Sequence, residues 1–237
     1  MNRPYVICHI LSSLDGKING PFMTTEVTKS LGGEYGRIRM EMDADAWLYG
    51  TTTVKEFLNF REPVLEKTIS VPEGDFIAGD EKKPYFVALD AKGELGWESG
   101  RFANKGRAEA HVIEILTEAA SLSYRAYLRK RGVSYILAGK TELDCKVAME
   151  KLYRLFHIKK LLICGGGVVD WTFLHAGMVD ELSMVLSPVT DGSCGGAAVF
   201  TQIPGVSDGS PIEFTLKAVE RIGDSGLYLN YLTKNAK

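Results

Sequence analysis

Short, continuous runs of apolar residues recur along the chain and are separated by longer segments of mixed polarity. Runs of this kind that are bounded by Gly, Pro or Asp are typical of strands covered on both faces. They predict strands at residues 5–11, 46–49, 85–89, 112–116, 134–137 and 161–164. Because helical segments lie between these runs, the pattern predicts the α/β fold class, with a mainly parallel sheet flanked by helices.

Apolar residues spaced by three or four positions predict the intervening helices. The segment 28–42 carries its apolar residues on one helical face, although the pair Gly32-Gly33 lowers its helical propensity. The same spacing predicts a helix over 148–156, with Asp144 as its N-terminal cap, and a shorter helix over 123–130.

The last quarter of the chain differs, because apolar and polar residues alternate there. Residues 181–186 are a strand candidate, and the alternating segments 214–218 and 227–231 flank the turn Gly223-Asp224-Ser225-Gly226. This pattern predicts an antiparallel C-terminal hairpin added to the parallel sheet. No repeat or interdomain linker is visible, so a single domain is predicted over residues 1–237.

Composition and charge narrow the function classes. The chain has 237 residues, of which 45% are hydrophobic and 24% are charged, and its net charge is −2. The lack of a basic run argues against a nucleic-acid partner, and no apolar run is long enough to predict a membrane span. Because the N-terminal residues lack a signal-peptide pattern, a cytoplasmic protein is predicted.

The spacing of cysteine and histidine residues predicts neither a disulfide framework nor a bound metal. No C-x-x-C pair occurs among the cysteines, which are Cys8, Cys145, Cys164 and Cys194. Cys8 and Cys164 lie in apolar runs and are predicted to be buried thiols. His9 and His111 lie in strand-like runs and are interpreted as packing residues.

The most informative motif is the glycine cluster Gly165-Gly166-Gly167, which ends the apolar run 161–164. A short helix over 170–175 is predicted to follow it. A strand that feeds a glycine turn at a helix start brings backbone N–H groups to one point, which suits a phosphate. The cluster therefore predicts a nucleotide-cofactor site, and the alternative interpretation is a tight turn alone.

The two common phosphate-binding loops are absent in their standard form. A G-x-G-x-x-G fingerprint that starts at Gly165 would need a glycine where Asp170 stands. A P-loop that ends at Gly139-Lys140-Thr141 would need a glycine where Ser134 stands. A nucleotide site in this chain therefore belongs to another architecture.

Two further strand ends carry turns that could contact a ligand. Residues 12–16 place Asp15 after the first strand, where it either enters a ligand crevice or simply forms a turn. Residues 50–53 follow the second strand, and their threonines either bind a phosphate or cap the next helix. These turns and the glycine cluster are expected along one edge of the sheet. No G-x-S-x-G motif indicates a serine nucleophile.

Four segments carry a resemblance to a known family. They are S-L-D-G-K-I at 13–18, D-A-W-L-Y-G-T-T-T-V at 45–54, L-I-C-G-G-G at 162–167 and F-L-H-A-G-M-V-D-E-L at 173–182. In this order they resemble the reductase domain of bacterial riboflavin biosynthesis, which has the dihydrofolate reductase fold. The resemblance implies a homodimeric, NADPH-dependent reductase of a small heterocyclic substrate.

The resemblance also implies roles for individual residues. The positions that match the NADPH-lining residues are Leu11, Thr53, Gly165, Gly166, Gly167, Val168 and Val169. Asp15 matches the catalytic side, as an orienting or proton-relaying carboxylate, and Ser13 and Cys164 match the substrate side. Lys55 or Lys140 is the candidate partner for a 2′-phosphate, since such a group needs a basic residue.

The substrate side departs from the family pattern. Cys164 stands where the riboflavin enzymes have a glutamate, Glu41 stands near their usual arginine, and Arg61 is out of register with their phosphate-binding arginine. The resemblance implies a 5-amino-6-(5-phosphoribosylamino)uracil reductase, and these changes imply that the substrate has diverged from this uracil compound. The alternative is an inactive nucleotide-binding protein or dimeric scaffold that keeps the glycine turn for folding. Residues 57–84 are interpreted either as a substrate-side flap or as a plain surface loop.

Overall fold

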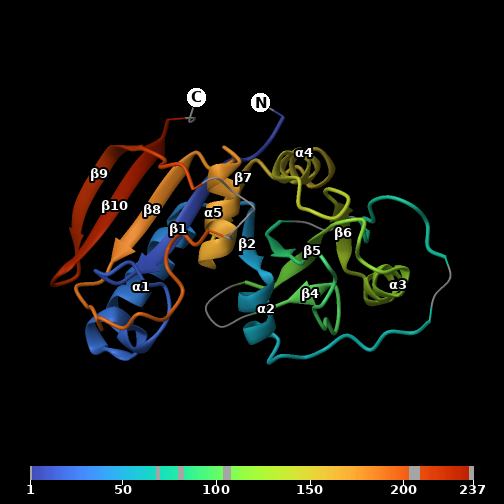
Figure 1. Cartoon of the computed structure of the whole chain (residues 1–237), viewed down its shortest axis with the longest axis horizontal. Helices are drawn as coiled ribbons and strands as arrows, with labels where there is room; N and C mark the ends of the chain where they lie inside the picture. The colour runs from blue at the N-terminus through green and yellow to red at the C-terminus, as the bar shows by residue number, and fades with distance from the viewer. Residues whose placement is uncertain (1, 68–69, 80–82, 104–107, 203–208, 235–237) are drawn as a thin grey trace. The chain divides into compact units, whose positions relative to one another are not determined.

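The computed structural model describes residues 2–67, 70–79, 83–103, 108–202 and 209–234, and it divides into two compact units (Figure 1). The first unit comprises Met1–Pro4 and Asp45–Leu161, and the second comprises Tyr5–Ala44 and Leu162–Lys237. The boundary between residues 4 and 5 falls at the start of the predicted strand 5–11. The boundary between residues 161 and 162 falls inside the predicted strand 161–164.

The first unit is built on parallel strands. Its strands are β2 (Ala46–Gly50), β3 (Tyr85–Leu89), β5 (Ala110–Leu116) and β6 (Ser134–Leu137), which pair in that order. All residues of β5 are buried, which includes the polar side chains of His111 and Glu114 between its apolar residues. The two-residue β4 (Arg101–Phe102) pairs antiparallel with β5 and is too short to produce a sequence pattern.

The helices of the first unit follow its strands. They are α2 (Thr51–Phe57), α3 (Leu122–Arg131) and α4 (Cys145–Phe156). Asp144 caps α4 by accepting a hydrogen bond of 2.9 Å from the Val147 N–H, as predicted. The threonines at 51–53 do not cap a helix but form the first turn of α2, because Gly50 occupies the cap position.

The long connection after α2 forms no helix or strand in its described part. Phe76 makes an isolated bridge to Tyr135 on β6, and the Asp75 carboxylate accepts hydrogen bonds of 2.8 Å from the Leu137 N–H and the Lys151 ammonium. Residues 75–76 are therefore anchored to β6 and α4 within the first unit. Whether the rest of 57–84 acts as a flap stays a prediction.

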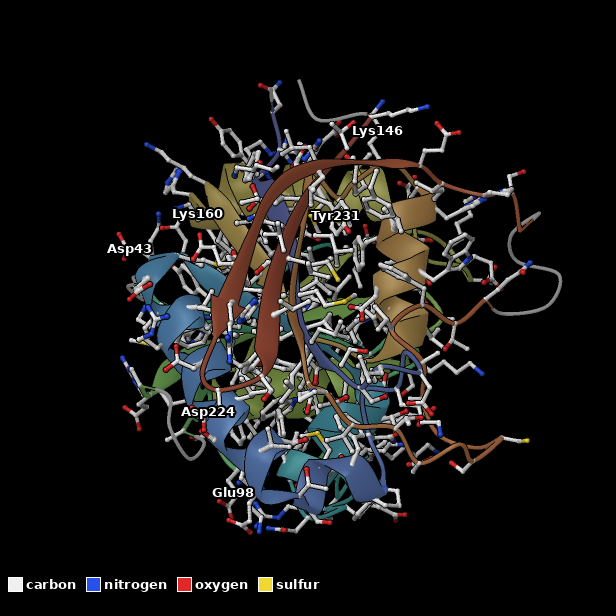
Figure 2. All side chains as sticks on the ribbon, turned by 90° about the vertical axis from the view of Figure 1, so that its left-hand side faces the viewer. Asp43, Glu98, Lys146, Lys160, Asp224 and Tyr231 are labelled. Carbon is white, nitrogen blue, oxygen red and sulfur yellow. The ribbon has the colours of Figure 1, made fainter. Side chains whose placement is uncertain are left out.

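The second unit combines parallel and antiparallel strands. β1 (Tyr5–Ser12) pairs parallel with β8 (Glu181–Leu186), next to which lie β10 (Gly226–Thr233) and β9 (Phe214–Ile222). β9 and β10 form the predicted antiparallel hairpin, with Asp224 at its turn and Tyr231 on β10 (Figure 2). β7 (Lys160–Ile163) leads from the first unit into the second. The mainly parallel strand pairing and the hairpin are both confirmed.

A long helix covers part of this second sheet. The short 3-10 helix η1 (Pro21–Thr24) precedes α1 (Glu26–Glu41), whose first turn is capped by the Thr25 side chain. Leu31 and Ile38 of α1 pack against Val185 of β8 and Ile222 of β9. The helix starts two residues before the predicted boundary at 28, because its cap residue precedes the apolar spacing that defined the prediction.

The third helix of this unit is α5 (Gly167–His175), and it corrects a prediction. The sequence pattern placed its start at Asp170, because glycines usually interrupt helices. In the structure Gly166 is the cap residue, and residues 167–169 already form the first helical turn. Among the described residues, no helix is long and apolar enough to cross a membrane.

Candidate functional site

The glycine turn connects β7 to α5 within the second unit. Gly165 has a φ of +102°, a conformation that residues with a side chain rarely adopt, so glycine is required there. Gly166 caps α5 in an extended conformation and offers no side chain to the N–H groups of the first turn. These N–H groups and the helix dipole form a potential anion site. This geometry fits the phosphate of a nucleotide cofactor.

Gly167 is needed for a different reason. A Cβ atom at this position would lie 2.0 Å from the backbone oxygen of Ala198, and its own carbonyl accepts a hydrogen bond of 2.9 Å from the Thr201 N–H. The close approach of residues 198–201 therefore explains this glycine without a ligand. Val168 is 39% exposed beside it, whereas Val169 is buried.

Asp170 lies in the first turn of α5, under the glycine turn, and is fully buried. Neither carboxylate oxygen makes a well-directed hydrogen bond, although the Cys8 thiol and the Gly165 backbone lie close enough to favour the ionised form. Burial outweighs both and raises the pKa of Asp170 well above its ordinary value. The raised pKa disfavours a negative charge on Asp170 at the N-terminal end of α5, where an anion would bind.

Asp15 lies in a tight turn after β1, in the same unit as the glycine turn. Gly16 has a φ of +77°, and the Ser13 N–H donates to the Lys17 carbonyl over 2.9 Å, which closes the turn. The Ser13 hydroxyl donates to Asp15 Oδ1 over 2.6 Å, and the Lys17 ammonium lies 2.9 Å from Asp15 Oδ2. These two donors hold the pKa of Asp15 well below its ordinary value. Asp15 is therefore an ionised carboxylate at neutral pH.

The remaining predicted site residues are distributed over both units. Leu11, on β1 opposite Val185, is half-buried in the second unit, and Thr53 is half-buried in the first turn of α2 in the first unit. Cys164 is only half-buried, which corrects its prediction as a core thiol, because β7 ends one residue before it. Cys8 is buried as predicted.

The candidate residues for a 2′-phosphate differ in their surroundings. The Lys55 ammonium forms an ion pair with Glu94, which raises its pKa. Lys140 is exposed, and no ion pair of its side chain occurs within the described part of the chain. No cluster of three potential metal ligands occurs among the residues that the structure describes.

Two residues of the site, Lys17 and Asp191, were not identified from the sequence. The Lys17 ammonium contacts Asp15, and it also donates a hydrogen bond to the Asp191 carboxylate. Lys17 and Asp191 are 174 positions apart in the sequence. Lys17 lies inside the motif at 13–18, so its position in the turn could have identified it. Asp191 lies in a loop of ordinary composition, and no local pattern distinguishes it from other loop aspartates.

The chain belongs to the RibD C-terminal domain family, whose model matches residues 4–228. It is 28% identical over 193 residues to the 2,5-diamino-6-ribosylamino-4(3H)-pyrimidinone 5′-phosphate reductase of Methanothermobacter thermautotrophicus, covering 80% of each chain. It is 24% identical over 229 residues to the reductase of the same name from Archaeoglobus fulgidus, covering 94% of this chain and 95% of the relative.

Solved structures show the same fold. A pyrimidine reductase-like protein from Corynebacterium diphtheriae superimposes with a TM-score of 0.68 at 19% identity, over 98% of this chain and 92% of that one. The riboflavin biosynthesis reductase of Saccharomyces cerevisiae gives a TM-score of 0.61 at 17% identity, over 98% and 91% of the two chains. The predicted dihydrofolate reductase-like α/β fold is thereby confirmed.

Family membership also fixes the general activity. The chain is an oxidoreductase similar to the reductases of riboflavin biosynthesis. A reductase of this kind takes its hydride from a nicotinamide cofactor. The sequence-based expectation of a nicotinamide-dependent reductase is therefore confirmed at this level.

Proposed function

We propose that this protein uses NADPH to reduce the ribosyl group of a ribosylaminopyrimidine 5′-phosphate. The observation that carries the proposal is the ionised Asp15 carboxylate, fixed by Ser13 and Lys17 in the unit that also contains the glycine turn. The relatives named above as pyrimidinone phosphate reductases support this substrate class.

The reaction is a two-electron reduction of an N-glycoside. The C1′–O4′ bond of the ribosyl group breaks, a hydride adds to C1′ and a proton adds to O4′, which yields a ribitylamino product. Bound NADPH supplies the hydride. Positive charge develops on the C1′–N unit as the sugar ring opens, and a fixed carboxylate stabilises such charge without reorganising.

We assign this electrostatic role to Asp15. Because its pKa is lowered, Asp15 carries no proton at neutral pH, so it serves as an orienting carboxylate rather than as the proton donor to O4′. Ser13 holds its Oδ1 atom. Cys164, beside the glycine turn, stays our candidate for a substrate contact.

The glycine turn is our proposed NADPH site. The uncapped N–H groups of the first turn of α5 would hold a phosphate, with Leu11, Gly165, Gly166, Gly167, Val168 and Val169 as the lining residues of the second unit. Thr53, in the first unit, stays a candidate from the resemblance alone. Lys140 or Lys55 would contact the 2′-phosphate that distinguishes NADPH from NADH. The raised pKa of the buried Asp170 supports the proposal, because burial disfavours a negative charge at this end of the helix.

We further propose a cytoplasmic homodimer that acts as a single domain. Support for a dimer comes from apolar side chains that are exposed on the C-terminal hairpin, which are Leu216, Val219 and Leu227. Light scattering of the purified protein measures the oligomeric state directly.

The test of the cofactor proposal is nucleotide binding followed by turnover. Calorimetric titration with NADPH and NADH is expected to show tighter binding of NADPH, and Gly166→Asp is expected to weaken it at least about tenfold, or ~1.4 kcal/mol. Gly33→Asp, at an exposed position of α1, is the matched control and should bind normally. Turnover is then followed as NADPH oxidation with the diaminopyrimidinone and uracil substrates.

The outcomes distinguish three functions, which are the diaminopyrimidinone reductase, the uracil reductase and the inactive scaffold. Oxidation of NADPH with the diaminopyrimidinone alone supports the proposal, and oxidation with the uracil substrate alone assigns the uracil reductase activity instead. Failure to bind either nucleotide would contradict the reductase assignment and favour the inactive scaffold.

A further inference from the structure

A loop that follows β8 runs along the Asp15 turn. We call residues 187–201 the clasp segment. Its backbone hydrogen bonds to the Asp15 turn join Ser187 to Ser12, Val189 to Leu14, Ala197 to Ile18 and Val199 to Gly16, at 2.8–3.0 Å. The same segment reaches α5, where the Thr201 N–H donates to the Gly167 carbonyl over 2.9 Å. The clasp segment is therefore hydrogen-bonded both to the Asp15 turn and to Gly167 of the glycine turn.

The clasp segment also contributes the Asp191 carboxylate, which contacts Lys17 beside Asp15. The Lys17 side chain is only 10% exposed, and its ammonium contacts Asp15 at 2.9 Å, the Ser193 hydroxyl at 2.9 Å and the Asp191 carboxylate. Asp191 is itself fixed, because its Oδ1 accepts a hydrogen bond of 2.9 Å from the Ser193 N–H. A single ammonium thus lies between two carboxylates that come from distant parts of the chain.

Asp191 is one of three groups, with Asp15 and Ser193, that hold the Lys17 ammonium in place. Its hydrogen bond is the largest influence that raises the pKa of Lys17, ahead of that from Asp15. Asp15 and Lys17 act on each other, and the other polar and charged groups that contact either of them are Ser13, Thr190, Asp191 and Ser193. Without Asp191, the flexible lysine side chain would lose the contact that aims its ammonium at Asp15.

We propose that Asp191 is a positioning residue of the reductase site, because it holds the Asp15 carboxylate in place through Lys17. The clasp segment therefore contributes to catalysis through Asp191. The inference rests on the proposed function, because Asp15 is assigned there to the charge that develops on the substrate. Asp191 itself is not assigned a contact with the substrate.

Asp191→Asn tests this role, and Asp224→Asn in the exposed hairpin turn is its matched control. We expect Asp191→Asn to lower kcat about ten- to a hundredfold, as misplacement of a site group does, and to leave NADPH affinity unchanged. Loss of Asp191 has two opposite effects on the pKa of Asp15: a displaced Lys17 ammonium raises it, whereas removal of the negative charge of Asp191 lowers it. The positioning role predicts that the first effect dominates, so the acid limb of the kcat/KM pH profile should move to higher pH, and a move to lower pH would contradict this role. The control should match the wild type in every measurement.

A carboxyl NMR titration of Asp15 gives a readout that does not depend on turnover. We expect its titration midpoint to rise in Asp191→Asn and to return toward the wild-type value in Asp191→Glu, which restores the charge. If Asp191→Asn fails to fold, the Glu variant and Ser193→Ala supply the comparison, since each disturbs only part of the Lys17 contact.

The outcomes separate the two proposals. An active wild type with an unchanged Asp15 titration and a kcat within about twofold in Asp191→Asn would overturn the positioning role alone. A wild-type protein that binds NADPH but turns over neither pyrimidine substrate would overturn the proposed function, while the titration would still report whether Asp191 acts on Asp15.

Discussion

At the residue scale, two aspartates of the second unit have pKa values that are displaced in opposite directions. Hydrogen bonds from Ser13 and Lys17 lower the pKa of Asp15, whereas burial raises that of Asp170. The site therefore presents one fixed negative charge at Asp15, while burial disfavours a second one on Asp170 at the helix N-terminus. The sequence contains both residues, but only their surroundings determine which one is charged.

The first prediction concerns Asp15. Replacing it by asparagine keeps the shape of the side chain and removes its charge, so we expect kcat/KM to fall about 10²- to 10³-fold, the usual cost of losing one electrostatic contact to a transition state. Steady-state kinetics with NADPH held at saturation measure the effect. A variant that kept kcat/KM within about threefold would rule out the proposed role of Asp15.

At the element scale, the helical glycines differ in whether the surrounding packing requires them. A Cβ atom added at Gly32, Gly33 or Gly36 of α1 would meet no atom within 4 Å, so nothing in the packing of α1 requires these glycines. Gly167 at the start of α5 is required by the clasp segment, whose Ala198 oxygen would lie 2.0 Å from its Cβ. The sequence pattern treats all of them alike, as weak points in a helix.

The second prediction compares these positions. Gly33→Ala should stabilise the protein by about 0.5–1 kcal/mol, because alanine restricts the unfolded chain and favours the helix. Gly167→Ala should destabilise it by about 1–3 kcal/mol, because the Ala198 backbone must move away. Urea unfolding of both variants measures the two free energies. Equal effects at both positions would contradict the packing role of Gly167.

At the scale of the whole molecule, a buried histidine links folding to pH. His9 on β1 is fully buried, stacks on the Tyr35 ring at 4.2 Å and hydrogen-bonds to the Ser183 hydroxyl and the Tyr35 carbonyl. The interpretation of His9 as a packing residue is thereby confirmed. Burial lowers its pKa from 6.5 to about 4.

The third prediction follows from this lowered pKa. Between pH 6.5 and about 4 the unfolded chain binds a proton that the folded protein does not, so the stability present above pH 6.5 is lost as the pH falls. At pH 5 the loss is about 2 kcal/mol, at ~1.36 kcal/mol per pH unit. Urea unfolding at pH 7 and pH 5 measures it.

His9→Gln is the control for this titration. Glutamine cannot take up a proton, so the difference in unfolding free energy between the two pH values should shrink by about the same 2 kcal/mol. Hydrogen exchange of the β1 and β8 amides would report on the second unit specifically. An unchanged pH dependence in the variant would show that other groups cause it.

The sequence by itself determined the features that depend on local spacing. Apolar runs located β1, β2, β3 and β5–β7, and residues 181–186 were a further strand candidate that corresponds to β8. Alternation located the C-terminal hairpin, and the Ser-x-Asp-Gly and glycine motifs located the turns of the candidate site. These signals work because a strand or helix that buries one face must repeat its apolar residues with the period of that element.

Only the tertiary structure decided the features that depend on contacts between distant segments. Asp191 joins Lys17 across 174 positions, Gly167 is fixed by the approach of Ala198, and burial rather than composition sets the charge of Asp170. The physical reason is that pKa values and close packing depend on the groups that surround a residue in space, and the sequence orders those groups only along the chain.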